Sequence, residues 1–313
     1  MIENKDWEYI AIQLANTGVM SWRDIALHVG KPKSTVSDML RKYSSFVKTE
    51  EVVQKKANTH LVIPDCQTKD GVSFEFLKWI GEYIVKKLPD VIVNLGDFAD
   101  MPSLSSWDKG KQSHEGQNVQ RDILATKRAM KILLQPLRDL QEKQRQNGEP
   151  VYNPRMVMLY GNHCDRITRH VEANPELFGF LSLESLGYEE AGWETVPFLT
   201  PIIIDGIAYN HYFPNPGNGK AMSGTADVML KNLGISFVQG HRQTMSIGTR
   251  FISTTGQQMW GLILGACYQH EEKYLTATGN KHFRGVAVLH NVENGSYDPM
   301  LVSLKWLEEQ YGK

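Results

Sequence analysis

Short apolar runs alternate with longer amphipathic segments from residue 60 onward, and this alternation constrains the fold more than any other feature of the chain. Apolar residues at helical spacing over residues 76–88 and 119–140 predict two helices, and the runs around them are typical of buried strands. Strands that alternate with helices indicate an α/β sheet. With 313 residues, of which 41% are hydrophobic and 22% charged, the chain can bury a core of this kind.

Polar side chains that can bind metal ions follow five of these strands, at the point where each strand ends. Because α/β sheets place their sites beyond the carboxyl ends of the strands, we expect these side chains to gather at one edge. Any one of them has an ordinary explanation as a turn or surface residue, but five successive cases indicate metal-ligand chemistry. The residues concerned are Asp65 and Gln67, Asp97 and Asp100, Asn162, His163 and Asp165, Asn210 and His211, and His241 and Gln243.

The order of these motifs resembles that of the calcineurin-like metallophosphoesterases. The family pattern is D-x-H, GD-x-x-D, GNH followed by an acid, a lone His, and GH-x-H, and this chain has DCQ at Asp65, GDFAD at Gly96, GNHCD at Gly161, His211 and GHRQ at Gly240. The resemblance covers about residues 60–245. It implies an α/β fold with two mixed sheets packed as a sandwich and flanked by helices. We expect the tail, residues 251–268 and 284–292, to complete the second sheet.

The resemblance also implies a centre of two divalent metal ions that Asp97 bridges. Three further residues bind each ion: Asn162, His211 and His241 the first, and Asp65, Gln67 and Gln243 the second. The family has His at both Gln positions, so the second ion would have oxygen ligands alone. Oxygen ligands favour Mn²⁺, with Mg²⁺ as the other candidate, over Zn²⁺. We expect weak binding of the second ion, and a centre with a single ion or without activity is the alternative.

The chemistry that the resemblance implies is hydrolysis of a phosphoester by a hydroxide that the two ions activate. His163 would protonate the leaving oxygen, and Asp100 would orient its imidazole. Asp165 is the alternative partner of His163. Arg166 and Arg242 are near enough in the sequence to bind a phosphate, although solvated surface arginines are more common.

Residues 7–43 alternate helical apolar spacing with short breaks, and the second part, residues 22–43, resembles a helix-turn-helix. Gly30 is expected to end one helix and Ser34 to cap the next, a recognition helix over residues 34–43. Six basic and two acidic residues between positions 23 and 48 give a local excess of four positive charges. A trihelical module for packing or dimerisation is the alternative. The side chains expected to contact DNA are Lys33, Ser34, Thr35, Ser37, Arg41 and Lys42.

These patterns predict a helix-turn-helix domain over residues 1–47, a polar linker over 48–59 and a metallophosphoesterase domain over 60–313. A homodimer is an open alternative to a monomer, since helix-turn-helix modules often dimerise. The net charge of −1 excludes a chain-wide basic field, so any contact with DNA must come from a local patch. The three cysteines are too few for a disulfide framework, and neither a signal peptide nor a membrane-length apolar stretch is evident. We therefore expect a cytoplasmic protein without membrane contact.

Three functions are compatible with these residues. The first is hydrolysis of DNA phosphodiester bonds by a nuclease that the helix-turn-helix targets to DNA, because the plain GDFAD and GNH blocks resemble the DNA-repair exonuclease branch of the family. The second is a phosphatase or phosphodiesterase acting on a protein or small molecule. Met101 and Cys164 disfavour a protein phosphatase, because the Ser/Thr phosphatases of this fold have Arg and Glu there. The third is a DNA-binding regulator with a disabled phosphoesterase domain.

Overall fold

The structure is a computed structural model that describes residues 6–16, 20–46, 58–272 and 281–312. It divides into two compact units, Met1–Lys56 and Ala57–Lys313. The expected linker lies outside the described residues except for Asn58 and Thr59, with which the first strand begins. The domain boundaries therefore stay predictions.

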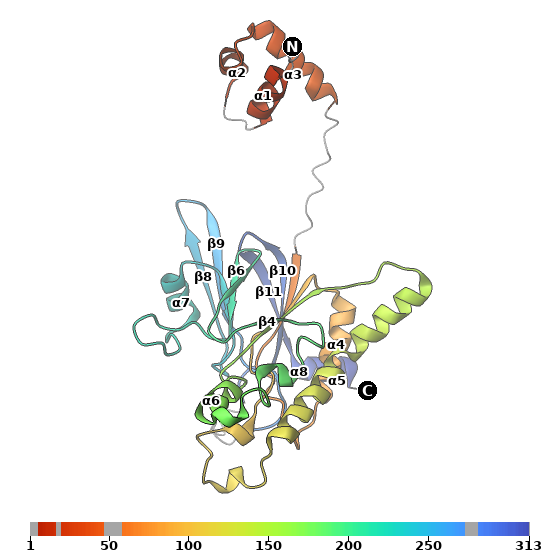
Figure 1. Ribbon diagram of the computed structural model, residues 1–313, viewed down its shortest axis with the longest axis vertical. Coiled ribbons are helices and arrows are strands. Elements are labelled where there is room, and N and C mark those ends of the chain that lie inside the picture. Colours follow the sequence, from red (N-terminus) through yellow and green to blue (C-terminus); the bar gives the residue numbers. More distant parts are fainter. Residues whose placement is uncertain (1–5, 17–19, 47–57, 273–280, 313) are drawn as a thin grey trace. The chain divides into compact units, whose positions relative to one another are not determined.

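Three helices form the described part of the first unit (Figure 1): α1 (Asp6–Asn16), α2 (Trp22–His28) and α3 (Lys33–Phe46). Residues four positions apart lie on one face of a helix, as Val36 and Leu40 do on α3. Both are buried in a small apolar core that they share with Ala11, Ile25 and Ala26. The predicted small all-α region ahead of the sheets is therefore present.

The turn between α2 and α3 matches the prediction in part. Gly30 follows α2 with a φ of +64°, a left-handed conformation that glycine adopts without steric cost. The expectation that Ser34 caps α3 is wrong. The helix begins one residue earlier, at Lys33, and Val36 N donates to Pro32 O at 3.1 Å. Because the proline ring holds φ close to the helical value, the first turn can start directly after it.

Two mixed sheets form the core of the second unit (Figure 1). The first contains β1 (Asn58–Ile63), β2 (Val91–Asn94), β3 (Arg155–Leu159), β4 (Glu194–Val196), β10 (Gly285–Glu293) and β11 (Ser296–Ser303). The second contains β5 (Ile202–Ile204), β6 (Ile207–Asn210), β7 (Phe237–Gln239), β8 (Ser246–Ile252) and β9 (Gln257–Ile263). Their strand orders are β11-β10-β1-β2-β3-β4 and β5-β6-β7-β9-β8. In the first, β1 to β4 are parallel, and in the second, β6, β7 and β9 are.

The two sheets share one apolar layer, as the predicted sandwich requires. Successive residues of a strand point to opposite faces of its sheet. Val62 and Val93 of the first sheet accordingly join Val238 and Leu262 of the second in a single buried cluster. Leu61, next to Val62, points the other way and belongs to the cluster that helices cover. The predicted fold class is confirmed.

Helices cover both outer faces of the sandwich. On the first sheet lie α4 (Glu75–Lys87), α5 (Val119–Asn147) and α8 (Leu304–Tyr311), and on the second lies α7 (Ala226–Leu233). The two predicted helices are thus present as α4 and α5, and α5 ends later than expected, just before Gly148. Shorter helical segments are α6 (Arg166–Ala173), η1 (Pro102–Leu104), η2 (Gln112–His114), η3 (Pro175–Leu177) and η4 (Leu183–Leu186).

The placement of the tail corrects the sequence expectation. Strands β8 and β9 belong to the second sheet as expected, but β10 and β11 extend the first. Strand β10 pairs antiparallel with β1, with Leu61 opposite Val288. Its residues alternate between both apolar layers, because Val288 packs under the helices and Ala287 between the sheets. A strand buried on both faces fits the free edge of either sheet, so its composition could not decide between them.

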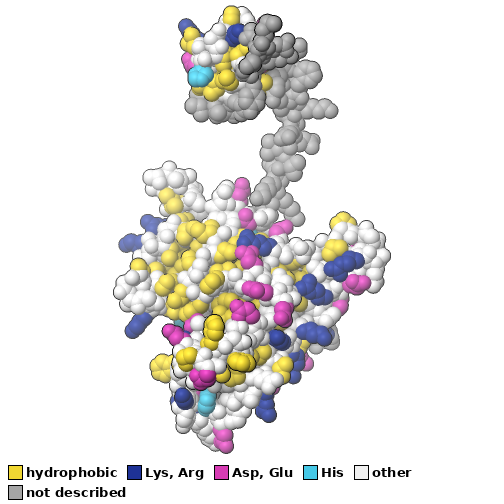
Figure 2. Space-filling model, in the orientation of Figure 1, with side chains coloured by type: hydrophobic (Ala, Val, Ile, Leu, Met, Phe, Trp, Pro, Cys, Tyr) yellow, Lys and Arg dark blue, Asp and Glu magenta, His cyan; other side chains and the backbone are white. Residues whose placement is uncertain are grey.

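The face of the second unit drawn in Figure 2 mixes all classes of side chain. On the face shown in Figure 2, basic and acidic side chains are interspersed, and hydrophobic side chains lie among them. This agrees with a net charge near zero. Within the described segments, no helix combines the length and the apolar composition that crossing a bilayer demands.

The close crossing of α4 and α5 at Gly81 predicts how a substitution there changes stability. A Cβ atom at Gly81 would lie 2.3 Å from Leu133 O and 3.0 Å from Pro136 Cδ, so the two helices can approach only because residue 81 is glycine. We expect Gly81→Ala to lower the free energy of unfolding by about 1–3 kcal/mol, despite the higher helix propensity of alanine. Urea denaturation measures this. Lys86→Ala, at an exposed site on the same helix, is the control and should shift stability by less than about 0.5 kcal/mol. Equal stability of the two variants would contradict the prediction.

Candidate metal centre

The turns that follow β1, β2, β3, β6 and β7 bring predicted site residues together at one end of the two sheets. The ligand atoms of Asp97, His211 and His241 all lie within 4.8 Å of one another. Asn162 joins them, since its Oδ1 lies 2.9 Å from His211 Nε2. Asp97 is 1% exposed and His211 is 0% exposed, whereas Asn162 and His241 are half-buried, so the cluster extends from the interior to the surface.

A close approach of backbone to carboxylate explains the glycine in two of the motifs. A Cβ atom at Gly161 would lie 2.0 Å from Asp97 Oδ1, and one at Gly240 would lie 2.5 Å from Asp65 Oδ1. With glycine at these positions, a backbone amide of each motif donates to the same oxygen, at 2.8 Å in the first case and 2.9 Å in the second. Each buried carboxylate therefore has one oxygen satisfied by the backbone.

Four of the predicted ligands have a backbone conformation that residues other than glycine rarely adopt. The angle φ is +43° at Gln67, +48° at Asp97, +67° at His241 and +59° at Gln243. A left-handed residue costs about 1–2 kcal/mol, and such strain persists only where surrounding contacts enforce it. Here the amides of Cys66 and Gln67 donate to Asp97 O, at 3.2 and 2.9 Å, and so tie two of the turns together.

His211 has the hydrogen-bond pattern of a metal ligand. Its Nδ1 lies 2.9 Å from Leu95 O, which can only accept, so Nδ1 carries a proton and Nε2 is the atom left for a cation. Nε2 faces two further acceptors, Asn162 Oδ1 at 2.9 Å and Asp97 Oδ2 at 3.2 Å. Three acceptor atoms that converge in this way need either an extra proton or a cation between them.

The pKa values of this cluster also indicate that its acceptor atoms need a proton or a cation between them. Burial lowers the pKa of His211, but the charge of Asp97 and the hydrogen bond to it outweigh burial and raise the value to about 9. Burial raises the pKa of Asp97, yet the charges of His211 and His163 hold it well below its ordinary value. Burial and the charge of His211 lower the pKa of His241 to about 4, so its imidazole is in the neutral form that binds metal. The donor set of Asp97, Asn162, His211 and His241 fits a divalent cation.

The other predicted ligand set is arranged differently. Gln243 Nε2 donates to Asp65 Oδ2 at 2.8 Å, and Gln243 Oε1 accepts from the Tyr268 hydroxyl at 2.8 Å. Asp65 is fully buried, and burial together with the charge of Asp97 raises its pKa to about 6 against the opposing charge of His211. Gln67 is also buried, in the turn after β1. With the amide nitrogen of Gln243 on Asp65 and its oxygen on Tyr268, this set does not fit a cation.

His163 and Asp100 form the pair expected of a proton donor and its partner. His163 Nδ1 lies 2.6 Å from Asp100 Oδ1, and His163 Nε2 lies 3.9 Å from Asp97 Oδ2. Burial lowers the pKa of His163, but the charges of Asp97 and Asp100 raise it above the ordinary value. Asp165, the alternative partner, pairs with Arg169 at 3.1 Å instead.

Contacts that sequence reasoning missed surround this pair. Lys69 Nζ lies 2.9 Å from Asp100 Oδ2 and also binds Glu272 Oε1, and Glu272 Oε1 lies 2.6 Å from His270 Nε2. From the sequence, Arg166 is expected either to bind a phosphate or to be a solvated surface arginine. It donates to Asp100 O at 2.8 Å and to Asp100 Oδ1 at 3.2 Å. Burial raises the pKa of Asp100, but the hydrogen bond and charge of His163, with the charges of Lys69 and Arg166, hold it well below its ordinary value. No motif marks Lys69 or Glu272, which lie 203 positions apart.

The predicted DNA-contact residues lie on α3. Lys33, Ser34 and Thr35 are exposed on its first turn, and Ser37 is half-buried. Arg41 and Lys42 lie on the second half of α3, but their side chains lie outside the described part of the structure. Their contact with DNA stays a prediction.

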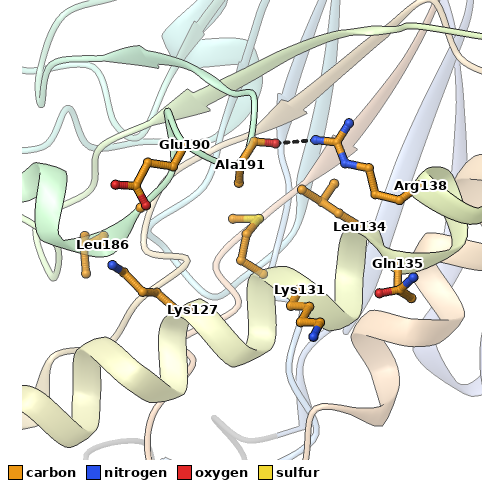
Figure 3. A pocket seen from close by; sticks show the side chains of 10 residues that line it. Lys127, Lys131, Leu134, Gln135, Arg138, Leu186, Glu190 and Ala191 are labelled. Carbon is orange, nitrogen blue, oxygen red and sulfur yellow. Dashed lines mark hydrogen bonds between the residues drawn. The ribbon is translucent and has the colours of Figure 1, made fainter. Parts of the chain in front are cut away.

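A separate hollow of about 330 Å³ lies between α5 and the segment after η4 (Figure 3). Lys127, Lys131 and Glu190 line it, and Arg138 Nη2 donates to Ala191 O at 2.6 Å across its rim. None of its lining residues is a predicted site residue. Its basic side chains all come from one face of α5. The candidate site therefore remains at the strand ends.

Comparisons with known proteins give distant similarities. No family model matches this chain. The "Gene 54 protein" of Mycobacterium phage L5 is 25% identical over 196 residues, which are 60% of this chain and 71% of that protein. The protein TT1561 of Thermus thermophilus is 8% identical with a TM-score of 0.31, over 80% of this chain and 100% of that one. The Pseudomonas putida nuclease MPE is 13% identical with a TM-score of 0.28, over 77% and 87%. Similarities of this size leave the function to be argued from the site itself.

The raised pKa of His211 predicts that metal binding releases a proton. Below pH 9 the metal-free protein holds a proton on His211, and a cation binds the neutral imidazole, so affinity should rise with pH and level off above about 9. At neutral pH we expect about one proton per bound Mn²⁺. Calorimetry in two buffers of different ionisation enthalpy measures the number of protons released. His211→Gln should bind Mn²⁺ weakly, whereas His290→Gln, on β10, should behave as the wild type. A binding enthalpy independent of buffer would contradict the prediction.

Proposed function

We propose that this protein is a calcineurin-like metallophosphoesterase that hydrolyses DNA phosphodiester bonds. The observation that carries this proposal is the position of two groups at the same strand ends. One is the acceptor cluster of Asp97, Asn162, His211 and His241, and the other is the His163 imidazole held by Asp100. A cation site beside a positioned acid is the arrangement that phosphoester hydrolysis needs.

When bound by the acceptor cluster, a divalent cation supplies Lewis acidity toward a phosphoester oxygen. Mn²⁺ is the ion we propose, with Mg²⁺ second. In the acceptor cluster Asp97 and Asn162 offer oxygen, the ligand atom that suits these ions, and His211 and His241 offer imidazole nitrogen. Asp97 is held for this task, because its Oδ1 accepts from His163 N at 2.8 Å while Oδ2 faces His211.

His163 is the proton donor in this proposal. Burial lowers its pKa, but the charges of Asp97 and Asp100 raise it above the ordinary value and so favour the protonated imidazole. Because Nδ1 faces the Asp100 carboxylate at 2.6 Å, the proton on Nε2 is the one available to a leaving oxygen. The side chain is 12% exposed, and Arg166 Nη2 lies 3.4 Å from Nε2, so an anionic group at this position would meet two donors. Lys69 and Arg166 keep Asp100 ionised, which fixes the imidazole in place.

Exposed aromatic side chains support a nucleic-acid substrate. Trp107 is 83% exposed, and Phe178 and Phe180 are 83% and 87% exposed. Trp107 follows the turn of Asp100 in the sequence, and the two phenylalanines follow α6, whose first residue is Arg166. Large exposed aromatics are unfavourable in water but provide stacking surfaces for unpaired bases.

The three-helix unit supports DNA as its partner. The exposed first turn of α3 carries Lys33, Ser34 and Thr35, which are residue types that contact phosphates. A helix-turn-helix places its second helix in the major groove, and the local positive excess favours that approach. We propose that this unit delivers the phosphoesterase unit to DNA.

Hydrolysis of four substrates tests the enzymatic proposal: single-stranded DNA, duplex DNA, bis-p-nitrophenyl phosphate and p-nitrophenyl phosphate, each with Mn²⁺. We expect DNA and the diester to be cleaved, EDTA to stop both, and Asp97→Asn to remove activity. His163→Gln should lower kcat on DNA by about 10²–10⁴-fold. The loss should be smaller on the nitrophenyl diester, because nitrophenolate leaves without a proton. Asp165→Asn, next to the same motif but paired with Arg169, is the matched control.

Two outcomes decide against the nuclease. Intact DNA beside rapid turnover of the monoester would indicate a phosphatase. Intact DNA and no turnover of any ester, with DNA binding retained, would indicate a regulator with a disabled domain.

Salt dependence of DNA affinity tests the helical unit. Lys33→Ala should weaken binding and reduce the slope of log K against log salt by about 1, because one phosphate contact is lost. Hydrolysis of the small diester should not change. Lys86→Ala removes an exposed lysine of the other unit and should leave the slope as it is. An unchanged slope for Lys33→Ala, Arg41→Ala and Lys42→Ala together would assign the unit to packing or to dimerisation, which sedimentation then distinguishes.

A further inference from the structure

The two halves of the site differ in what their polar atoms face. On the His211 side, acceptors face acceptors: Nε2 of this residue, Asn162 Oδ1 and Asp97 Oδ2 converge. On the Asp65 side, donors face acceptors, because both oxygens of this carboxylate accept hydrogen bonds. A cation binds most favourably where acceptor atoms converge, and least favourably where hydrogen-bond donors already satisfy those atoms.

From this difference we infer that the centre binds one divalent cation and that the amide of Gln243 occupies the place of a second. The Gln243 NH₂ group supplies to Asp65 Oδ2 the positive partner that a second ion would supply. An amide nitrogen cannot bind a cation, and the amide oxygen accepts from Tyr268 OH at 2.8 Å. This inference rests on the metal centre of the proposed function and does not depend on its substrate.

A second ion would have to rearrange these bonds. Turning the Gln243 amide would direct its oxygen toward the ion, but it would leave the Tyr268 hydroxyl without the acceptor that it now has in Gln243. Asp65 would also lose a donor in a fully buried position. The ion would gain only a neutral carbonyl in exchange.

Tyr268 is held in the orientation that this arrangement needs. Its ring stacks on His270 with centroids 4.5 Å apart and planes at 20°, and the guanidinium of Arg284 lies 3.7 Å from the ring centroid. His270 in turn contacts Glu272, the partner of Lys69. The segment that carries Tyr268 therefore reaches both the Gln243 amide and the ion pairs around Asp100.

The number of tightly bound ions tests this inference directly on the full chain. Equilibrium dialysis with Mn²⁺ followed by elemental analysis should find one ion per chain, and the EPR spectrum should be that of an isolated Mn²⁺ ion. The double variant Gln67→His/Gln243→His replaces both amides by imidazoles. It should bind two ions and show the spectrum of a spin-coupled pair, while thermal melts confirm that it is folded.

The outcomes separate this inference from the proposed function. Two ions in the wild type, with a spin-coupled spectrum, would overturn the inference and leave the phosphoesterase proposal intact. A wild type that binds no ion would overturn both. One ion together with inert DNA would retain the inference and reject the nuclease.

Discussion

The buried carboxylate of Asp97 is the group on which the arrangement of the site depends. A charge that is 1% exposed is tolerated only with close compensation. Two segments supply it: the amide of His163 binds Oδ1, and the ring of His211 faces Oδ2. The turn after β1 holds the backbone of the same residue by donating to its carbonyl oxygen. The backbone near this carboxylate is adapted to these contacts. Asp97 itself has a left-handed conformation, and residue 161 is glycine because a Cβ atom there would collide with the carboxylate.

Much of this arrangement could be predicted because strand ends are encoded locally. An apolar run that breaks into glycine and a carboxylate marks the end of a strand, and parallel strands bring such ends to one edge of a sheet. This reasoning predicts that Asp97, Asn162 and His211 lie near one another, as they do in the structure. It also predicted α4 and α5, whose apolar spacing is helical over several turns. Local pattern suffices when one periodicity runs through a whole segment.

Contacts between distant segments could not be predicted in this way. Strand β10 is apolar on both faces, and its composition does not tell which free edge it takes. Lys69 and Glu272 are ordinary charged residues until the fold brings them together. The choice between Asp100 and Asp165 as partner of His163 depended on the direction of a single turn. Gln243 is the clearest case, because its role depends on Tyr268, which belongs to no motif.

The ion pairs around the site explain how two acids of one turn can serve different purposes. Asp100 is compensated by fixed side chains, Lys69 and Arg166, so its charge stays in place for His163. Asp97 faces His211, whose imidazole can lose its second proton. The positive charge that compensates Asp97 can therefore be exchanged for a cation. A cation can replace a proton but cannot easily displace a half-buried lysine or arginine that is already paired. On the proposed function, this difference directs the ion to Asp97 and reserves Asp100 for orienting the acid.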